Sequence, residues 1–323
     1  LYVFGNILPV EKAGKAYSQL AECLLVQMFD RVRAAFEVKH GCLPKSSVAV
    51  VGLGNLGDRH LTATSDLDLL ILYEFDPDEE MSDGPKPLQA SQYFGRLTQR
   101  FISAMSAPTA QGIVYELDMR LRPYGTDGPV ATSLRAFEKH YSERAETWER
   151  LALTRARVLH ADESFAEKVR TQIEAATTGL NAGNVTKDVL DMRSLMDRER
   201  PSKDVWDVKL AKGGMIDLEF LIQWAKLTGA VQPDETETSI FTKITDSSLQ
   251  NDKMTLADAL RIFRVVVQLI RLCLEDTNST EWPDGFRTLM LKHLNVPDMA
   301  AAEAMLSGVQ NDVRATFLSL LKA

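Results

Sequence analysis

The stretch from Val48 to Leu72 reads VAVVGLGNLGDRHLTATSDLDLLIL, and its interpretation decides the fold. An apolar run leads into a Gly-x-Gly-x-x-Gly pattern, whose glycines are Gly52, Gly54 and Gly57. Such a pattern directly after a strand is typical of a dinucleotide-binding loop. The same stretch contains Asp66 and Asp68, two carboxylates at a spacing that suits a metal ion. The two interpretations imply different folds and different chemistry.

The dinucleotide-binding interpretation fails on the length of the connection between the two strands. In that fold the third glycine lies in a helix that crosses back to a parallel strand, and such a crossover needs about a dozen residues or more. Only Asp58 to Asp66 separate Gly57 from the second strand, and this segment, DRHLTATSD, is a poor helix former. Asp76 stands where a ribose-binding acid is expected, but it does not replace the missing crossover. We therefore expect a loop between the two strands.

Asp66 and Asp68 favour a metal-dependent nucleotidyltransferase site instead. They stand two residues apart at the start of a strand, where alternate side chains point to the same face. Leu67, Leu69 and Ile71 then point to the opposite face. Because Mg²⁺ typically binds one or two carboxylates together with substrate phosphates, this pair predicts a magnesium site.

A third carboxylate is expected on a third strand, IVYELDMRLRP, at 113–123. Its polar residues alternate with apolar ones and share one face; they are Glu116, Asp118, Arg120 and Arg122. Asp118 would then reach the first pair, and three carboxylates can hold one or two metal ions that stabilise the attacking and leaving oxygens. Gly54 and Gly57 would let backbone N–H groups approach a triphosphate. The alternative is a hairpin with surface acids.

Strand-like segments are confined to about 45–125, and helical patterns fill the remainder. Residues 11–40 predict a helix with apolar positions at helical spacing: Leu20, Leu24, Met28, Val32 and Phe36. A second amphipathic helix is expected at 91–107, and helices again from about 133 onward. The pattern predicts an α+β protein whose sheet-containing domain is joined to an all-helical domain. We place a helical lead-in at 1–44, the sheet-containing domain at 45–165 and the helical domain at 166–323.

The composition, with 45% hydrophobic and 25% charged residues, is that of an ordinary globular protein. Because the net charge is -8, we expect no binding to a nucleic-acid backbone. We also expect no membrane segment, since no apolar run approaches the ~20 residues that span a bilayer. The three cysteines share no short spacing, which favours a reducing, cytoplasmic setting. The sequence does not begin with Met, and we expect it to be part of a longer protein.

Four motifs give the chain a family resemblance that runs over nearly its whole length: GLGNLGDRHLTATSDLDLLILYEFD, YELDMRLRPYGTDGPVATS, TWERLALTRARV and DVKLAKGGMIDLEFLIQW. Together they resemble the glutamine synthetase adenylyltransferase (glutamate–ammonia-ligase adenylyltransferase) family. The resemblance implies a DNA-polymerase-beta-like nucleotidyltransferase domain, with a small mixed sheet, followed by a helical bundle. Members of the family carry two such units. One looks like a unit that removes AMP by phosphorolysis, and the other transfers AMP from ATP to a tyrosine of glutamine synthetase.

Details of the motifs resemble the transferring, C-terminal unit. The motif GGMIDLEF carries Asp217, whereas the removing unit usually reads GGxREIEF there. Arg155 stands where the removing unit tends to have Lys. The resemblance therefore implies a two-metal, Mg²⁺-dependent transfer of AMP that regulates nitrogen assimilation, with a PII-type signalling protein as a further candidate partner. Removal of AMP, or a degenerate regulatory module that binds nucleotide or partner without turnover, are the alternatives. We expect the glycine pair of GGMIDLEF to set a turn before a helix.

The resemblance also assigns roles to individual residues. Asp66 and Asp68 would be the metal-binding pair, and Asp118 the third carboxylate and a base for the tyrosine hydroxyl, whose pKa of about 10 calls for such help. The residues expected along the triphosphate path are Gly54, Gly57 and Ser65. Those expected to neutralise phosphate charge are Arg120 and Arg122, unless they pair across strands with Glu116.

The glycine stretch departs from the pattern of the family, which usually reads GKLGGxEL. Asn55 replaces the Lys, Asp58 replaces the second Gly of the pair, and His60 replaces the Glu. These changes remove one cation and add a negative charge near the expected phosphates, which Arg59 would offset only in part. We still expect metal and nucleotide binding, while the rate of transfer and the preferred nucleotide stay open.

Overall fold

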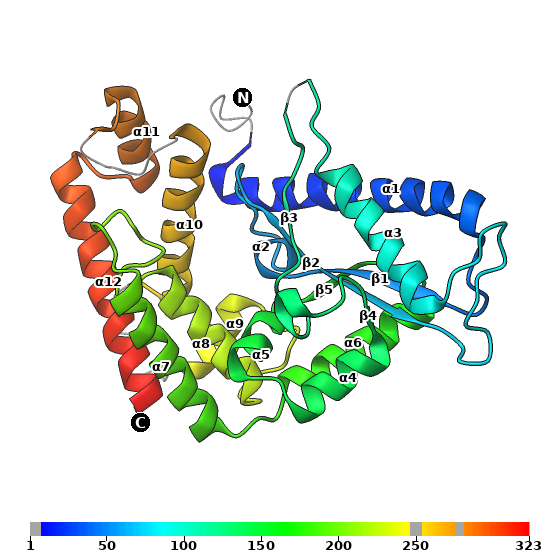
Figure 1. Ribbon diagram of the computed structural model, residues 1–323. Coiled ribbons are helices and arrows are strands. Elements are labelled where there is room, and N and C mark those ends of the chain that lie inside the picture. Colours follow the sequence, from blue (N-terminus) through cyan, green and yellow to red (C-terminus); the bar gives the residue numbers. More distant parts are fainter. Residues whose placement is uncertain (1–7, 111, 246–253, 275–280, 323) are drawn as a thin grey trace. The chain divides into compact units, whose positions relative to one another are not determined.

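The computed structural model describes residues 8–110, 112–245, 254–274 and 281–322 (Figure 1). These residues fall into two compact units. The sheet unit comprises Lys15–Leu61 and Ser65–Thr177; the helical unit comprises Thr178–Ala323 together with Leu1–Gly14 and Thr62–Thr64. Most of the helix expected as a lead-in falls in the sheet unit, which ends at Thr177. The domain boundaries drawn from the sequence stay a prediction.

The sheet is small and mixed, and it is built around one antiparallel pair. This pair is β1 (Ser47–Gly52) and β2 (Leu67–Glu74). The strand order is β3–β2–β1–β5, with β4 paired to β2 off this path. β3 (Leu117–Asp118) and β4 (Thr132–Ser133) run parallel to β2, whereas β5 (Arg157–His160) runs antiparallel to β1. The antiparallel β1–β2 pair is incompatible with a dinucleotide-binding fold, in which the corresponding strands are parallel.

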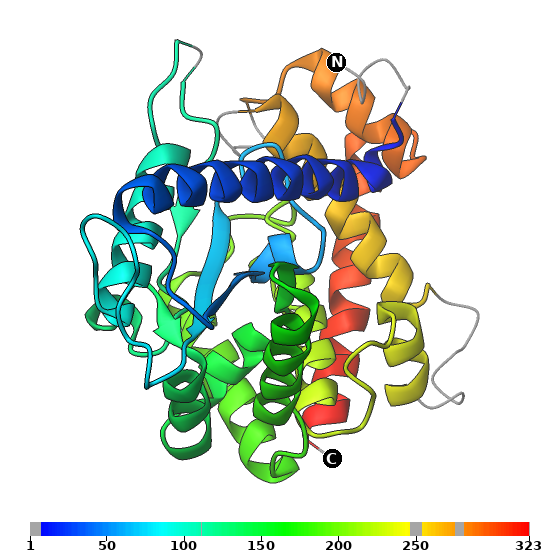
Figure 2. The same cartoon turned by 90° about the vertical axis from the view of Figure 1, so that its right-hand side faces the viewer.

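Helices cover both faces of this sheet (Figures 1 and 2). On one face lie α1 (Val10–His40) and α3 (Ala90–Met105), and on the other lie α4 (Leu134–Glu143) and α6 (Glu163–Thr177). The shorter elements of the sheet unit are α2 (Gly54–Gly57), α5 (Thr147–Leu153) and a single 3-10 turn at Gly125–Asp127.

The side chains of β2 alternate between the two faces, as the sequence predicted. Those that pack with α1 and α3 are Leu67, Leu69 and Ile71, and those that pack on the face of α4 and α6 are Leu70 and Leu72. Because Asp68 lies between Leu67 and Leu69, it belongs to the face of α4 and α6.

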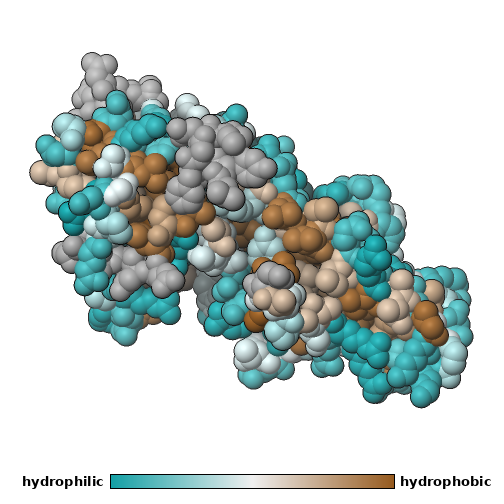
Figure 3. Space-filling model, turned by 90° about the horizontal axis from the view of Figure 1, so that it is seen from above, coloured by the Kyte–Doolittle hydropathy of each residue, from teal (hydrophilic) through white to brown (hydrophobic). Residues whose placement is uncertain are grey.

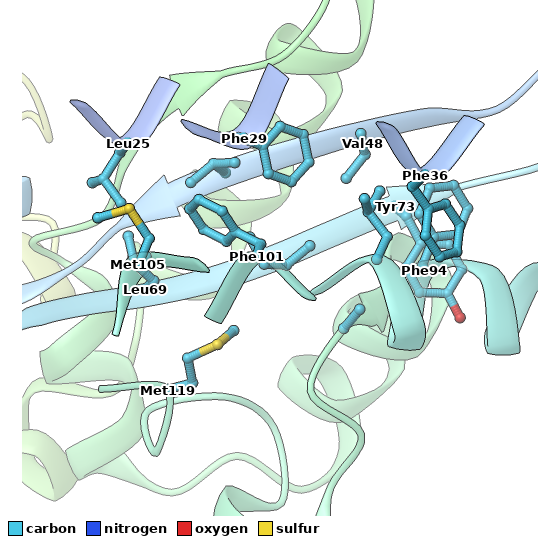
Figure 4. Close-up of a cluster of buried hydrophobic side chains, with 14 of the residues drawn as sticks. Leu25, Phe29, Phe36, Val48, Leu69, Tyr73, Phe94, Phe101, Met105 and Met119 are labelled. Atoms are coloured by element: carbon cyan, nitrogen blue, oxygen red, sulfur yellow. The ribbon is translucent and has the colours of Figure 1, made fainter. Parts of the chain in front are cut away.

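The buried face of α1 overlaps the expected stripe in part, at Phe36, Met28 and Val32. Its buried residues include Ala21, Leu25, Phe29 and Phe36, whereas Leu20 and Leu24 are 55% and 37% exposed. Figure 4 shows Leu25, Phe29 and Phe36 of α1 together with Phe94 and Phe101 of α3. The helix carries two adjacent apolar rows, so spacing alone did not determine which row faces the sheet.

Three short strands differ from the expectation. The strand expected at 113–123 is reduced to the two residues of β3, because the chain turns directly after Asp118. β4 and β5 lie outside 45–125, the range to which we expected strands to be confined, and β5 lies in a region that we expected to be helical. A strand of two or four residues has too few alternations to be recognised in a sequence.

The helical unit contains, in the described residues, α7 (Ala182–Glu199), α8 (Met215–Leu227), α9 (Glu237–Ile244), α10 (Leu256–Cys273), α11 (Asp284–Leu294) and α12 (Met299–Lys322). The expected glycine turn before α8 is present. Gly213 has a φ of +77°, and a Cβ at this position would lie 1.7 Å from the carbonyl oxygen of Gln310 in α12. The close approach of α12 therefore requires glycine there.

A buried ion cluster joins α7, α8 and α12. Asp217, which is 0% exposed, forms ion pairs with Arg193 and with Arg314, the latter at 3.0 Å. It also accepts a hydrogen bond of 2.8 Å from the backbone N–H of Gly213. Asp197 binds the same two arginines, at 2.5 and 3.3 Å. Two carboxylates thus balance two guanidinium groups, which makes a buried arrangement tolerable. The structure gives Asp217 a structural role.

In the described part of the chain, no helix is long and apolar enough to cross a membrane. Figure 3 shows hydrophobic residues interspersed with hydrophilic ones on the face seen from above. Cys23, Cys42 and Cys273 are all free thiols.

We predict that Asp217→Asn destabilises the helical unit by about 3–5 kcal/mol, because the change leaves the buried Arg193 and the partly buried Arg314 without a full counter-charge. Urea unfolding followed by tryptophan fluorescence measures this, since three of the four tryptophans lie in α8 and in the segments before α8 and α11. Asp191→Asn, at an exposed position of α7, is the matched control and should change stability by no more than about 0.5 kcal/mol. Equal effects of the two substitutions would contradict the structural role of the cluster.

Candidate active site

The antiparallel β1–β2 pair places the glycine turn beside the start of β2. Gly52, at the end of β1, pairs with Leu69, and the backbone N–H of Leu53 donates a hydrogen bond of 2.9 Å to the carbonyl oxygen of Asp68. The chain then continues into the single helical turn of α2. The turn and the carboxylates are therefore neighbours because of strand direction.

Gly54 is required at its position for two reasons. Its φ of +52° lies in the left-handed region, which favours glycine. A Cβ there would also lie 2.3 Å from the Oδ2 atom of Asp68. The backbone of the turn thus packs directly against the Asp68 carboxylate, and only glycine leaves room for it.

The parallel pairing of β2 and β3 brings two of the three expected carboxylates together. Asp68 and Asp118 are direct partners in the register of the two strands. Neighbouring strands lie about 4.8 Å apart, so the two side chains stand next to each other. Asp66 and Ser65 lie in the segment before β2, where Asp66 is exposed and Ser65 is partly exposed.

The three carboxylates do not converge into a ready-made metal cage. Within the described ranges, no group of three or more His, Cys, Asp or Glu side chains is arranged to hold a metal ion. Asp118 is bound instead by Arg120, whose Nε atom lies 3.0 and 2.9 Å from the two carboxylate oxygens. The Arg120 side chain is 75% exposed, so this ion pair lies at the surface.

The electrostatic states of the two paired carboxylates differ. Burial raises the pKa of Asp68 to about 6; the negative charges of Asp118 and Asp66 add to the rise, while Arg155 opposes it. Hydrogen bonds from Arg120 hold the pKa of Asp118 below its usual range. Of the two carboxylates, Asp68 is therefore the one whose negative charge is unfavourable. A cation bound beside Asp68 would stabilise this charge.

Arg122 and Gly57 serve the local structure. The buried Arg122 guanidinium donates hydrogen bonds to the carbonyl oxygens of Met119, Gly128 and Thr126, at 2.6, 3.1 and 3.3 Å. It therefore holds together the turn that follows β3. A Cβ on Gly57 would lie 1.7 Å from the Arg155 carbonyl oxygen, so packing alone requires glycine there.

Arg155 has a role that the sequence analysis missed. Its guanidinium donates a hydrogen bond of 2.8 Å to Oδ1 of Asn55 and forms an ion pair with Asp58. Both partners are departures from the usual family pattern. The charge of Asp58, which we expected to repel phosphates, thus has a cationic partner 97 residues further along the chain. Arg155 also lowers the pKa of Asp68, so its positive charge acts on the carboxylate pair.

Arg157, at the start of β5, holds the other side of the glycine turn. Its guanidinium donates hydrogen bonds to the carbonyl oxygens of Gly57 and Leu56, at 2.9 and 3.0 Å. It also pairs with Glu22 of α1, with a nitrogen–oxygen distance of 3.1 Å. The only signal in the sequence was two arginines two residues apart, which did not reveal their partners.

These features define an α+β protein in which a glycine turn and paired carboxylates meet at the start of a central strand. A model of the glutamate-ammonia ligase adenylyltransferase family matches residues 2–172. Curated relatives named bifunctional glutamine synthetase adenylyltransferase/adenylyl-removing enzyme are also similar. The relative from Brucella suis biovar 1 is 43% identical over 316 residues, which cover 96% of this chain and 32% of the relative. The relative from Mesorhizobium japonicum is 41% identical over 326 residues, which cover 99% of this chain and 33% of the relative.

The chain belongs to the glutamate-ammonia ligase adenylyltransferase family. This confirms the family that the four motifs indicated. The chain spans about a third of the length of the curated relatives that it matches.

We predict that Gly54→Ala lowers the stability of the chain by about 1–3 kcal/mol, because the new Cβ strains the left-handed backbone and collides with Asp68. The matched control is Gly95→Ala within α3, where a Cβ meets nothing within 4 Å. This control should raise stability by about 0.5–1 kcal/mol, since alanine is the better helix former. Thermal unfolding of both variants tests the prediction, which fails if Gly54→Ala is as stable as the wild type.

A second prediction concerns the pH dependence of stability. The pKa of Asp68 is raised to about 6 in the folded state, whereas an unfolded chain has a value of about 3.9. The proton therefore binds more tightly to the folded state, so the contribution of this carboxyl to stability is complete below about pH 4 and is lost as the pH rises through 6.

Asp68→Asn removes this pH-dependent loss, because the amide has no charge at any pH. In metal-free buffer at pH 7.5 the variant should be about 1–3 kcal/mol more stable than the wild type, and near pH 4 the difference should vanish. Urea unfolding at the two pH values measures it, with the exposed Asp127→Asn as the control. A wild type that is the more stable protein at pH 7.5 would contradict the assignment.

Proposed function

We propose that this chain transfers AMP from ATP to a tyrosine of glutamine synthetase. One observation carries the proposal: Asp68 and Asp118 are register partners on parallel strands, beside a glycine turn that contacts Asp68. The names of the relatives, which describe a glutamine synthetase adenylyltransferase, support the same activity. The fold that we propose for the sheet unit is the DNA-polymerase-beta-like nucleotidyltransferase fold, to which a small mixed sheet with helices on both faces conforms.

The donor set suits Mg²⁺, because all the groups are hard carboxylate oxygens and the space beside Asp68 is kept open by a glycine. We propose that Asp66, Asp68 and Asp118 hold one or two Mg²⁺ ions. When bound, Mg²⁺ supplies positive charge that stabilises the oxygens of the phosphoryl group under attack. Asp118 must first leave Arg120, and the exposed position of the Arg120 side chain permits this rearrangement.

We propose that residues of the chain also bind the phosphates and accept the proton of the tyrosine. Released from Asp118, Arg120 is free to bind the phosphates, as guanidinium groups commonly do. Gly54, Gly57 and Ser65 form the proposed edge of the triphosphate path. Asp118 is also the proposed acceptor of the tyrosine proton.

Removal of AMP is the second candidate function, because the names of the relatives describe both activities. The expectation of AMP transfer rather than AMP removal rests on Asp217 and Arg155. Both residues have structural contacts, and these contacts do not distinguish the two reactions. A non-catalytic nucleotide- or partner-binding module is the third candidate. It loses part of its support, because Arg155 neutralises the Asp58 charge that motivated it. A PII-type signalling protein remains a proposed partner.

The test is incorporation of labelled AMP into glutamine synthetase from ATP labelled at the α-phosphate, with Mg²⁺ and the purified chain. Asp66→Asn and Asp68→Asn should reduce labelling to background, while Asp127→Asn should retain it. Unfolding does not explain such a loss, because Asp68→Asn is expected to be the more stable protein. Undiminished labelling in both variants would rule out the proposed site. Phosphate-dependent release of ADP from adenylylated glutamine synthetase, without labelling, would favour the removing activity.

A further inference from the structure

A pocket of about 330 Å³ lies between α1 and α3 in the sheet unit. The two helices cover the same face of the sheet (Figure 1). α1 ends at His40, shortly before β1 begins at Ser47, whereas Gly52 at the far end of β1 pairs beside Asp68. The pocket and the carboxylate pair therefore lie at opposite ends of β1.

From α3 the pocket is lined by Arg96, Gln99, Arg100 and Ser103. These positions recur at i, i+3, i+4 and i+7, so they form one stripe on the helix. The sequence of α3, ASQYFGRLTQRFISAM, contains no acidic residue. Arg96 and Arg100 are like charges one helical turn apart, which is an unfavourable arrangement unless an anion lies between them. The helix thus places two repelling cations on the wall of the pocket.

From α1 the pocket is lined by Phe36, Lys39 and His40. The Arg100 guanidinium carbon lies 5.1 Å from the centre of the buried Phe36 ring. This cation–π contact positions the Arg100 charge over the apolar ring. His40 donates a hydrogen bond of 2.7 Å from Nδ1 to a backbone carbonyl oxygen, which fixes its ring. Lys39 adds a third positive charge.

Within the part of the chain that the structure describes, no acidic side chain neutralises these three cations. Across the described residues, none of the ion pairs within 4.0 Å involves Lys39, Arg96 or Arg100. The nearest acid along α1, Glu37, is paired with Arg33 at 2.8 Å. A cluster of three cations without acidic partners is notable in a chain whose net charge is -8.

We propose that this pocket binds a small ligand with two or more negative charges on oxygen, of the phosphate or carboxylate class. The forked geometry of two arginines matches such oxyanions, and the volume lies at the lower end of small-molecule sites. The limited volume favours a small molecule over an extended polymer. The site contains none of the residues proposed for AMP transfer, so the two proposals are independent.

The experiment is calorimetric titration of the full chain, in buffer freed of metal ions on a chelating resin, with three separate probes. Inorganic phosphate and pyrophosphate represent the phosphate class, and succinate represents the dicarboxylates. We expect saturable binding of at least one probe. Arg96→Gln/Arg100→Gln should weaken this binding at least tenfold. Both side chains are exposed, and glutamine is nearly as good a helix former as arginine, so the fold should persist.

Two controls make the result specific. Arg135→Gln/Lys139→Gln removes another pair of exposed cations one helical turn apart, on α4, and should leave the affinity unchanged. Asp127→Asn, which changes an exposed acid outside the pocket, should also leave it unchanged. The proposal is overturned if no probe binds saturably, or if the probe binds Arg96→Gln/Arg100→Gln as tightly as the wild type. A preference for pyrophosphate or for succinate identifies the class of ligand.

Discussion

The antiparallel pairing of β1 and β2 is the constraint on which the candidate active site depends. It returns the chain to the end of β1, so the glycine turn and the start of β2 become neighbours without a crossover helix. β3 then adds Asp118 beside Asp68 through a pairing of only two residues. Arg155 and Arg157 come from the segment at the opposite edge and fix the turn between them. The start of β2, β3 and the segment that contains Arg155 and Arg157, all distant from one another in sequence, thus converge on one short loop.

Charge is treated differently in the two units. In the helical unit, Asp197 and Asp217 face two arginines, so the buried ions balance each other. In the sheet unit, Asp118 has a counter-ion in Arg120, but Asp68 is left with the repulsion of its neighbours and a raised pKa. The first arrangement is what a permanent structural contact requires. The arrangement at Asp68 is typical of a functional site, where a charged group lowers the stability of the fold but is available to bind a ligand.

The central strands, the loop between them and the family could be predicted from the sequence. The reason is that β-branched runs, strand alternation and motif spacing are local properties. The sequence also predicted that Asp118 lies on a strand near Asp68; the structure adds that the two residues are register partners. The sequence did not reveal that the chain turns after Asp118, which moves Arg122 from the expected phosphate-binding face into a buried turn. The contacts of Arg155 to Asn55 and Asp58 also stayed hidden, since partners about a hundred residues apart leave no periodic pattern.

The contact between Glu22 and Arg157 has a consequence for how this protein can be divided. Glu22 belongs to α1, which precedes the first strand, yet it binds the arginine that holds the carbonyl oxygens of the glycine turn. A recombinant fragment that starts at β1 would contain every proposed active-site residue. It would nevertheless lose the counter-ion of Arg157 and uncover the part of one apolar face of the sheet that α1 covers. The smallest autonomous version of the site must therefore include α1.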